Sequence, residues 1–185
     1  MNVYDFDGTI YAGDCTLDFW IFCVKKYPKA LIALPGAVLA CLQFKFGLVK
    51  REYFKEKFYQ FLKYIPSIEQ EVVTFWDKNI VKIKRWYYEQ QRSDDLVISA
   101  SPEFLIAEIC ERLKIKYIAS KVDCKTGKLL GANCRGAEKV SCFKLVYPNE
   151  KIEKFYSDSK SDEPLAEIAQ SAYLVSNNKI EKWRF

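Results

Sequence analysis

The spacing of apolar residues divides this chain of 185 residues into two kinds of segment. Between residue 14 and about residue 92, apolar side chains recur at every third or fourth position, the spacing of helices that bury one face. Two stretches, about 16–26 and 29–46, are apolar enough to be helices buried on most sides. Two further helical faces are formed by Phe54, Phe58, Phe61, Leu62 and Ile65, and by Ile68, Val72, Trp76, Ile80, Ile83 and Tyr87. The pattern predicts a bundle of about four helices.

Outside this stretch, short apolar strands alternate with helices. We expect strands near 96–98, 116–120, 152–157 and 172–176, a hairpin of two short strands within 122–134, and helices near 102–113, 137–147 and from Pro164. Such alternation indicates a parallel sheet, whose ligands lie beyond the carboxyl ends of the strands. The predicted fold class is α/β: residues 1–13 and 93–185 form a Rossmann-like parallel sheet with helices on both faces, and residues 14–92 are an inserted all-helical cap bundle.

Charge is distributed unevenly between these two parts. Residues 14–92 hold 14 lysines and arginines and eight acids, a net charge of +6, whereas the rest of the chain has a net charge of −1. The same insert holds 17 of the 29 aromatic residues. A basic, aromatic-rich module suits an anionic substrate with an apolar part, and a solvated lysine face over an aromatic core explains the composition equally well.

Within the insert, the run Ala30–Leu42 carries no charge and is flanked by basic residues. These flanks are Lys25, Lys26 and Lys29 on one side and Lys45, Lys50 and Arg51 on the other. The run is too short to span a bilayer, which needs about 20 apolar residues. It is therefore either a buried helix of the cap or an apolar hairpin in a membrane interface with its basic flanks on the head groups.

The usage of histidine and cysteine limits the possible chemistry. The chain has no histidine, which excludes a Ser-His-Asp or Cys-His mechanism within it and the usual imidazole-bound metal sites. Its seven cysteines are odd in number and form no Cys-x-x-Cys pair, so we expect reduced thiols in a cytoplasmic protein. A strand that starts at residue 3 leaves no room for a signal peptide before it.

Polar residues that can carry chemistry lie where the predicted strands end. Asp5 and Asp7 leave the first strand on the same side, and Gly8 lets the backbone approach a ligand closely. Ser99, Lys139, Asp158 and Asp162 lie at comparable positions, at strand ends or in the first turn of a helix. Each has a simpler explanation alone, as a turn residue, a surface lysine or a helix cap. Together they indicate a site, because successive strand ends meet at one edge of the sheet.

This set of side chains suits a metal ion and a phosphoryl group. Clustered carboxylates repel one another unless a cation is present, and a set of oxygen ligands favours Mg²⁺. A lysine and a serine hydroxyl beside that metal supply the charge neutralisation that phosphoryl transfer needs. Any catalysis in this chain must run on carboxylates, lysine, hydroxyls or a hard metal ion, since histidine is absent.

Four motifs in this order resemble those of the haloacid dehalogenase superfamily of phosphotransferases. They are Asp5-Phe6-Asp7-Gly8-Thr9, Val97-Ile98-Ser99-Ala100-Ser101, Gly136-Ala137-Glu138-Lys139-Val140 and Asp158-Ser159-Lys160-Ser161-Asp162. The insertion lies between the first and second motifs, so the chain is similar to the phosphoserine-phosphatase-like branch with an all-helical cap. The 40 positions between Ser99 and Lys139 are too few for the larger cap that other branches carry there.

The resemblance implies a two-step mechanism in which Asp5 forms an aspartyl-phosphate and Asp7 is first the general acid and then the general base. It implies catalytic roles for Asp5, Asp7, Ser99 and Lys139, and phosphate contacts from Gly8, Thr9, Ser99, Ala100 and Lys139. The implied cofactor is Mg²⁺, held by Asp5, by Asp7 through its main-chain carbonyl and by Asp158, with Asp162 close by or acting through water.

The substrate is less well defined by the resemblance. The first-motif loop of phosphoserine phosphatases has Ser where this chain has Gly8, and Glu where it has Asp14, and Ser161 replaces an Asn. The stretches 134–140 and 156–165, with the apolar run Ala30–Leu42, are instead similar to the bacterial phosphatidylglycerophosphatase C family. That likeness implies a lipid head-group phosphate such as phosphatidylglycerophosphate, and a cytoplasmic enzyme or one peripheral at the inner membrane surface through its cap.

Three alternatives remain open. One is a phosphoserine-phosphatase-like hydrolase of a small soluble phosphometabolite, and another is a phosphotransferase that passes the phosphoryl group to an acceptor alcohol. The third is a non-enzymatic module that binds nucleic acid through the basic, aromatic insert. We expect no nucleic-acid partner, because a decayed site would have lost some of the six catalytic positions and this chain keeps all of them. Arg51, Arg85, Trp20 and Tyr53 are candidate substrate contacts by residue type alone.

Overall fold

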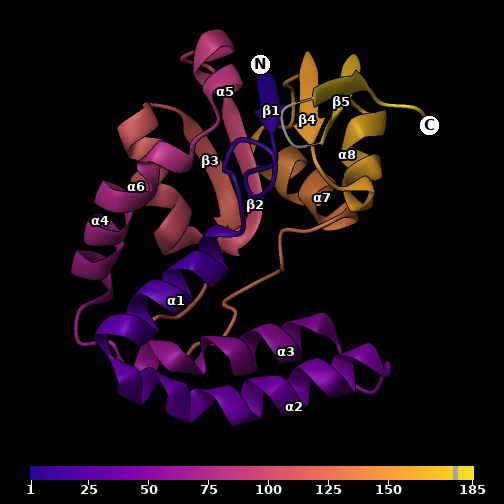
Figure 1. Ribbon diagram of the computed structural model, residues 1–185. Coiled ribbons are helices and arrows are strands. Elements are labelled where there is room, and N and C mark those ends of the chain that lie inside the picture. The colour runs from indigo at the N-terminus through magenta and orange to yellow at the C-terminus, as the bar shows by residue number, and fades with distance from the viewer. Residues whose placement is uncertain (177–178) are drawn as a thin grey trace.

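The computed structural model describes residues 1–176 and 179–185, and these contain one six-stranded sheet (Figure 1). The strands are β1 (Asn2–Tyr4), β2 (Leu96–Pro102), β3 (Lys116–Ser120), β4 (Lys154–Ser157), β5 (Ser171–Ser176) and β6 (Lys179–Lys182). Their order is β3-β2-β1-β4-β5-β6, and every neighbouring pair is parallel except β5 and β6. The predicted parallel α/β sheet is therefore confirmed, with an antiparallel strand added at one edge.

Helices cover both faces of the sheet (Figure 1). They are α4 (Ile68–Asn79), α5 (Arg85–Gln90) and α6 (Glu103–Leu113) on one face and α7 (Ala137–Val146) and α8 (Glu163–Glu167) on the other. Along β1, Tyr4 is buried against Tyr87 of α5, with ring centroids 5.0 Å apart. Val3 points the other way, into a cluster that includes Phe143 of α7 and Leu165 of α8. Both faces of the central strands are buried, as expected for a parallel sheet.

The remaining helical segments lie between β1 and α4. They are α1 (Cys15–Lys26), the 3₁₀ helix η1 (Pro28–Ala33), α2 (Leu34–Lys45), α3 (Arg51–Phe58) and the 3₁₀ helix η2 (Tyr59–Tyr64). Asp14 caps α1 by accepting a hydrogen bond from the Leu17 amide at 2.9 Å. Gly47, at φ +72°, reverses the chain so that α2 and α3 lie side by side (Figure 1).

Three long helical patterns are interrupted rather than continuous, which corrects the sequence prediction. The helix expected over 29–46 starts as η1 and continues as α2, because Pro28 and Pro35 each fit only the first turn of a helix. The face from Phe54 to Ile65 changes from α3 to η2 at Tyr59. The face from Ile68 to Tyr87 is split between α4 and α5 by a 3₁₀ turn, η3 (Ile80–Lys82). Within residues 14–92 the chain forms five α-helices instead of about four.

Helix α4 packs on α6 and α5 packs on the sheet, and neither packs on α2 or α3 (Figure 1). Trp76 of α4 donates its indole N–H to the Leu105 carbonyl of α6 at 2.8 Å. Trp86 of α5 lies against Tyr4 and Tyr156, with ring centroids 6.3 and 5.7 Å apart. The division into a core of residues 1–13 and 93–185 and a cap of residues 14–92 stays a prediction, but the helices that face the site are α1 and α3.

The hairpin predicted within 122–134 is a loop with a single bridge between Val122 and Leu129. Its main chain pairs across the loop from the Asp123 amide to the Lys128 carbonyl and from the Leu130 amide to the Lys121 carbonyl, both at 2.9 Å, and other polar groups bond to the α3–η2 segment. The Leu129 amide donates to Glu56, and Gln60 donates to the Thr126 carbonyl, at 3.1 and 2.7 Å. The loop therefore ties α3 and η2 to the core.

The strand predicted at 172–176 is β5, but it is not the last strand. Lys179–Lys182 pairs with it in the antiparallel direction as β6, which is fully exposed and so carries no apolar alternation that the sequence could show. The run Ala30–Leu42 falls in η1 and α2. Among the described residues, no helix is long and apolar enough to cross a membrane.

Candidate active site

Asp5 lies at the carboxyl end of β1 and is held by a buried lysine. Its amide donates to the Tyr156 carbonyl of β4 at 2.8 Å, which extends the pairing of the two strands by one residue. Its carboxylate accepts a hydrogen bond from Lys139 Nζ at 2.7 Å. Lys139, in the first turn of α7, also donates to Asp162 at 2.7 Å and is only 2% exposed. Asp162 accepts a further bond from the Ser157 hydroxyl at 2.9 Å.

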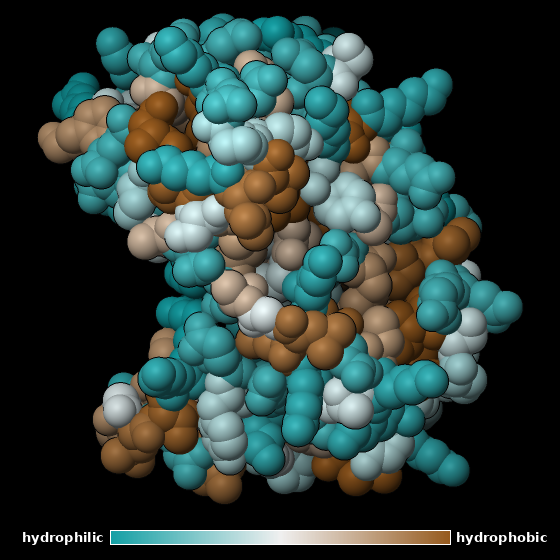
Figure 2. All heavy atoms as spheres, turned by 180° about the vertical axis from the view of Figure 1, so that it is seen from behind, coloured by the Kyte–Doolittle hydropathy of each residue, from teal (hydrophilic) through white to brown (hydrophobic). Residues whose placement is uncertain are grey.

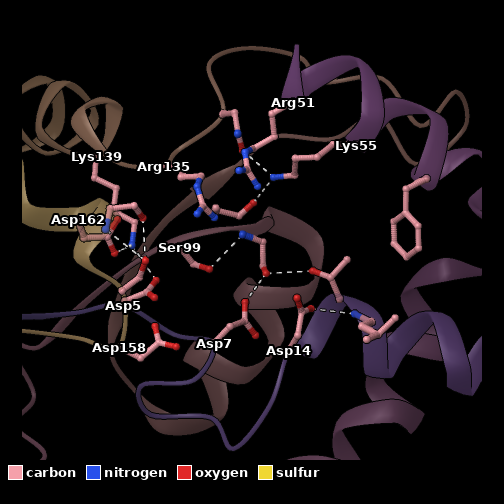
Figure 3. A pocket seen from close by; sticks show the side chains of 18 of the residues that line it. Asp5, Asp7, Asp14, Arg51, Lys55, Ser99, Arg135, Lys139, Asp158 and Asp162 are labelled. Atoms are coloured by element: carbon pink, nitrogen blue, oxygen red, sulfur yellow. Dashed lines mark hydrogen bonds and ion pairs between the residues drawn. The ribbon is translucent and has the colours of Figure 1, made fainter. Parts of the chain in front are cut away.

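The charged groups in this cluster alter one another's pKa values. Burial raises the pKa of Asp5 to about 6, although the nearby Lys139 ammonium opposes the shift. Burial alone would lower the pKa of Lys139, but Asp5 and Asp162 hold it above its ordinary value, so this lysine stays charged. The cluster therefore holds a fixed cation next to the Asp5 carboxylate (Figure 3).

Asp7 is held by different groups. One carboxylate oxygen accepts from the Cys15 amide at the start of α1, at 2.6 Å, and the other accepts from the Ser101 hydroxyl. Thr16 donates in turn to Ser101 at 3.0 Å, so a chain of hydroxyls fixes the orientation of Asp7. Burial, and secondly the nearby Asp14, raise the pKa of Asp7 to about 7. At neutral pH this carboxyl therefore carries a proton in a substantial part of the population.

Asp158 follows β4 directly and packs against the loop after β1. Its amide donates to the buried Thr9 hydroxyl at 2.9 Å. Gly8 has φ +71°, and a Cβ at that position would lie 2.0 Å from a carboxylate oxygen of Asp158. Only glycine leaves room for Asp158 beside the loop. Lys84 donates to the Gly8 carbonyl and fixes the same turn.

Three cations face the carboxylates across a cavity of about 440 Å³. They are Arg51 and Lys55 of α3 and Arg135 of the loop before α7 (Figure 3). Lys55 donates to the Ala100 carbonyl and to the Asn133 side chain, both at 2.6 Å. Burial, and secondly Arg135 and Arg51, lower the pKa of Lys55 to about 8. Figure 2 shows the hollow as a notch between the core above and the α2–α3 hairpin below.

The predicted site residues meet in this cavity. Asp5, Asp7, Ser99, Ala100, Lys139, Asp158 and Asp162 all line it. Ser99 is 1% exposed and accepts from the Ser101 amide at 3.1 Å, so its hydroxyl can still donate to a ligand. The phosphate contacts of Gly8 and Thr9 stay a prediction, because their amides already bond to the Gly13 and Phe6 carbonyls in the loop. The catalytic and metal roles of the other residues stay predictions as well.

Sequence reasoning missed several residues of the cavity. Of the four candidates chosen by type, Arg51 lines it, whereas Arg85, Trp20 and Tyr53 are not among its described lining residues. The missed residues include Thr16, Lys55, Ser101, Asn133 and Arg135, and the lining residues Leu17, Phe54, Phe58 and Tyr59. Ser101 lies two positions after Ser99 at a strand end, and this position could have suggested it. Nothing in the sequence brings Lys55 and Arg135, 80 positions apart, to one place.

The oxygen atoms at the floor of the cavity fit Mg²⁺. No group of three or more carboxylate, thiol or imidazole side chains among the described residues is placed to hold a metal by itself. Mg²⁺ is commonly bound by one or two carboxylates with waters and substrate oxygens. Asp5 and Asp158 supply two carboxylates. Burial raises the pKa of both, and the charge of Asp158 adds to the shift of Asp5, so a bound cation would stabilise the two charges. The donor set is therefore suitable.

The fold and the site together define a class of protein. A parallel sheet with two carboxylates after its first strand, a hydroxyl within the second and a buried lysine beside them is suited to phosphoryl transfer. A family model for haloacid dehalogenase-like hydrolases matches residues 3–167, and the chain belongs to this family. The match confirms the resemblance that the four motifs indicated.

Solved structures similar to this chain agree with that assignment. A protein of unknown function from Bordetella pertussis Tohama I has a TM-score of 0.73 at 17% identity, over 93% of this chain and 87% of the other. A phosphoserine phosphatase in a phospho-aspartyl intermediate analogue form has a TM-score of 0.57 at 18% identity, over 92% and 83%. A probable phosphoserine phosphatase from Vibrio cholerae has a TM-score of 0.62 at 13% identity, over 92% of this chain and 55% of the other.

These structures share the fold of this chain at low sequence identity. No curated protein sequence matches it. The family model confirms the predicted class of enzyme, a haloacid dehalogenase-like hydrolase, and the solved structures confirm the predicted fold, which phosphoserine phosphatases share. Membership of a family of hydrolases argues against the alternative of a non-enzymatic module that binds nucleic acid.

Proposed function

We propose that the protein is a Mg²⁺-dependent phosphomonoester hydrolase that works through an aspartyl-phosphate on Asp5. The observation that carries the proposal is the pairing of Asp5 with the buried ammonium of Lys139 at 2.7 Å, beside a second carboxyl, Asp7, whose pKa is about 7. The first arrangement favours the ionised form of a nucleophile, and the second leaves an acid protonated in a substantial part of the population at neutral pH. A phosphoryl transfer that ends in hydrolysis needs both.

In the first step an oxygen of Asp5 attacks phosphorus and the bond from phosphorus to the alcohol oxygen breaks. Asp7 gives its proton to that leaving oxygen, so the alcohol departs neutral. In the second step Asp7, now a carboxylate, takes a proton from water while the water oxygen attacks phosphorus. Inorganic phosphate leaves and Asp5 returns to its carboxylate form. Lys139 and the Ser99 hydroxyl stabilise the phosphoryl oxygens during both steps.

Mg²⁺ would be held by the Asp5 and Asp158 carboxylates and the main-chain carbonyl of Asp7, and when bound it supplies positive charge to the phosphoryl oxygens. Asp162 holds Lys139 in place through the bond at 2.7 Å, and its predicted contact with the metal, direct or through water, belongs to the proposal. Lys84 holds the Gly8 carbonyl, which keeps the loop in the conformation that admits Asp158.

The cations of the opposite wall favour a substrate with a second anionic group. Arg51, Lys55 and Arg135 face the carboxylates across the cavity, and Phe54 and Phe58 add apolar lining on the same side. A lipid head group such as phosphatidylglycerophosphate carries a phosphomonoester and a phosphodiester, which match the two walls. The enzyme would then be cytoplasmic and peripheral at the inner membrane surface, with its cap in contact with the lipid.

A small soluble phosphometabolite is the second candidate. Asp14 lies exposed at the cavity beside the cations, so an amino acid phosphate with a carboxylate and an ammonium group could be bound as well. The phosphoserine phosphatases with the same fold support this alternative. A phosphotransferase, in which an alcohol takes the place of water in the second step, uses the same residues.

A phosphate-release screen with and without EDTA tests the proposal. The panel holds phosphatidylglycerophosphate in mixed micelles, phosphoserine, sugar phosphates and p-nitrophenyl phosphate, and a second series adds glycerol as acceptor. We expect EDTA-sensitive release, with kcat/KM largest for the lipid. Asp5→Asn is expected to lose at least about 10³-fold in kcat with its circular dichroism unchanged. Release that EDTA leaves unchanged, or an active Asp5→Asn variant, would overturn the mechanism.

A further inference from the structure

Helix α2 exposes its large apolar residues and buries its small ones. The small residues Ala37 and Ala40 are buried, whereas the large residues Val38, Leu39 and Leu42 are 49%, 58% and 48% exposed. A helix on the surface of a soluble protein normally turns its large apolar residues inward. The spacing of the exposed residues places them on one side of the helix, so the exposure is continuous along it.

The apolar surface continues beyond both ends of α2. Its residues are Leu31, Ile32, Val38, Leu39, Leu42, Phe46 and Leu48, which we call the α2 stripe. Phe46 and Leu48, in the turn to α3, are 78% and 73% exposed. Figure 2 shows brown side chains gathered at this free end of the hairpin, at the lower left, and along the lower edge of the molecule. Contiguous exposed apolar surface of this kind marks an interaction site.

The charged residues of the chain segment that carries the α2 stripe are all of one sign. No acidic residue occurs between Asp18 and Glu52, whereas this stretch holds six lysines and arginines. Lys26 is bonded to Glu71 at 2.7 Å. The others on the rim, Lys25, Lys29, Lys45 and Lys50, are exposed and form no ion pair within the part of the chain that the structure describes. An apolar face with a basic rim is complementary to a bilayer that contains anionic lipids.

We propose that the α2 stripe docks in the interface of an anionic lipid bilayer, with the lysines of its rim on the head groups. Binding of this kind needs no helix that spans the bilayer. A second copy of the chain is the weaker occupant, because a symmetric dimer through this face would bring two basic rims together without any acid between them.

The docked orientation also brings the cavity close to the lipid. Helix α3 lies beside α2 and directs Arg51 and Lys55 into the cavity (Figures 1 and 3). A lipid phosphate could then reach Asp5 without leaving the membrane surface. This consequence rests on the proposed function, whereas the docking itself does not.

Co-sedimentation with vesicles tests the docking. The full chain is mixed with vesicles of phosphatidylcholine, with and without phosphatidylglycerol. We expect binding that requires phosphatidylglycerol, and a partition coefficient at least about tenfold lower for the double variant Leu39→Glu, Phe46→Glu. The matched control is Val81→Glu, Leu145→Glu, which changes residues of 82% and 84% exposure outside the α2 stripe and is expected to bind like the parent. Neutralising Lys29, Lys45 and Lys50 to Gln should weaken binding by about fivefold per lysine.

All variants are also assayed with p-nitrophenyl phosphate and by circular dichroism, because a docking surface should not affect the turnover of a soluble ester. Absence of binding by the parent chain, or an equal loss in the control variant, would overturn the proposal. A concentration-dependent dimer that Leu39→Glu, Phe46→Glu abolishes, without vesicle binding, would assign the α2 stripe to a second copy instead. Vesicle binding without hydrolysis of any ester would leave the docking intact and refute the proposed function.

Discussion

Two carboxyl groups that are two positions apart have different surroundings. Asp5 pairs with Lys139, and Asp7 accepts hydrogen bonds from the Cys15 amide and the Ser101 hydroxyl. Burial raises the pKa of both: to about 6 for Asp5, where the Lys139 ammonium opposes the shift, and to about 7 for Asp7. The proposed roles of Asp5 as nucleophile and Asp7 as acid therefore rest on the side chains and amides that each one contacts.

Ser101→Ala tests whether this hydroxyl positions Asp7 as the general acid. The variant should lose about tenfold in kcat with alkyl phosphates, whose leaving groups need a proton, and less than about twofold with p-nitrophenyl phosphate, whose leaving group does not. The measurement is a series of kcat values against the pKa of the leaving alcohol. Ser141→Ala, on the exposed side of α7, is the control. An equal loss for all leaving groups would show that Ser101 supports only the fold.

Lys55 should give the reaction a pH dependence that varies with the substrate. Because the pKa of Lys55 is about 8, the free enzyme loses this positive charge as the pH rises through about 8. The attraction for a second anionic group is present below that pH and is lost above it. We expect kcat/KM to fall above pH 8 for a substrate with two anionic groups and not for p-nitrophenyl phosphate. In Lys55→Arg, which stays charged, this fall should disappear; its persistence would assign the titration to another group.

At the scale of elements, the turn after β1 depends on one glycine. Gly8→Ala would place a Cβ 2.0 Å from Asp158 at φ +71°, so either the loop or the carboxylate must move. We expect a loss of stability of about 1–2 kcal/mol and a Mg²⁺ requirement at least about tenfold higher, because Asp158 is displaced. The measurements are thermal unfolding and activity against Mg²⁺ concentration.

Gly131→Ala is the matched control for this change, because nothing lies within 4 Å of its Cβ position and its φ is not positive. It should leave both measurements unchanged. Normal Mg²⁺ dependence in Gly8→Ala would contradict the placement of Asp158 in the metal site.

The same scale shows what the sequence could predict. Alternation of strands and helices predicted β3, β4 and β5 close to their observed bounds, because each is a short apolar run between turn residues, whereas it predicted the start of β2 but ended it at residue 98 instead of Pro102. Continuous helices failed where proline or a change to a 3₁₀ turn interrupts a face that remains apolar. Strand β6 was missed because its side chains are all exposed.

The residues at the floor of the cavity could be predicted because they lie near strand ends, in short motifs that can be recognised from a few consecutive residues. The opposite wall could not. Lys55 reaches the site only because α3 packs over it, and its bonds to Ala100 and Asn133 join segments 45 and 78 positions away. Tertiary contacts between segments so far apart produce no periodic pattern in the sequence from which they could be predicted.

For the whole molecule, Mg²⁺ should act as a ligand that stabilises the folded state. The metal binds the assembled carboxylates and not the unfolded chain, so saturation at about 100 times its dissociation constant should add about 2.7 kcal/mol to the free energy of unfolding. We expect the thermal midpoint to rise with Mg²⁺ in the parent chain and in Glu167→Gln, an exposed control. Asp158→Asn should show little or no rise, and an undiminished rise in it would place the metal elsewhere.

The two parts of the molecule divide the work. The sheet and the segments that follow its strands carry the residues proposed to act on phosphorus, and the segment from η1 to α3 carries Arg51, Lys55 and the α2 stripe. Reaction and substrate choice can therefore be separated by mutation. Changes in α2 should alter the access of lipid, and changes at the strand ends should alter turnover of every ester.

Chemical trapping of residue 5 tests the central claim most directly. Borohydride reduces an acyl phosphate to an alcohol, so an aspartyl-phosphate at position 5 becomes homoserine, which peptide mass spectrometry detects. We expect homoserine at position 5 only when the enzyme is quenched with borohydride during turnover, and none in Asp5→Asn. Turnover that proceeds while residue 5 remains aspartate, or homoserine at another position, would contradict the mechanism.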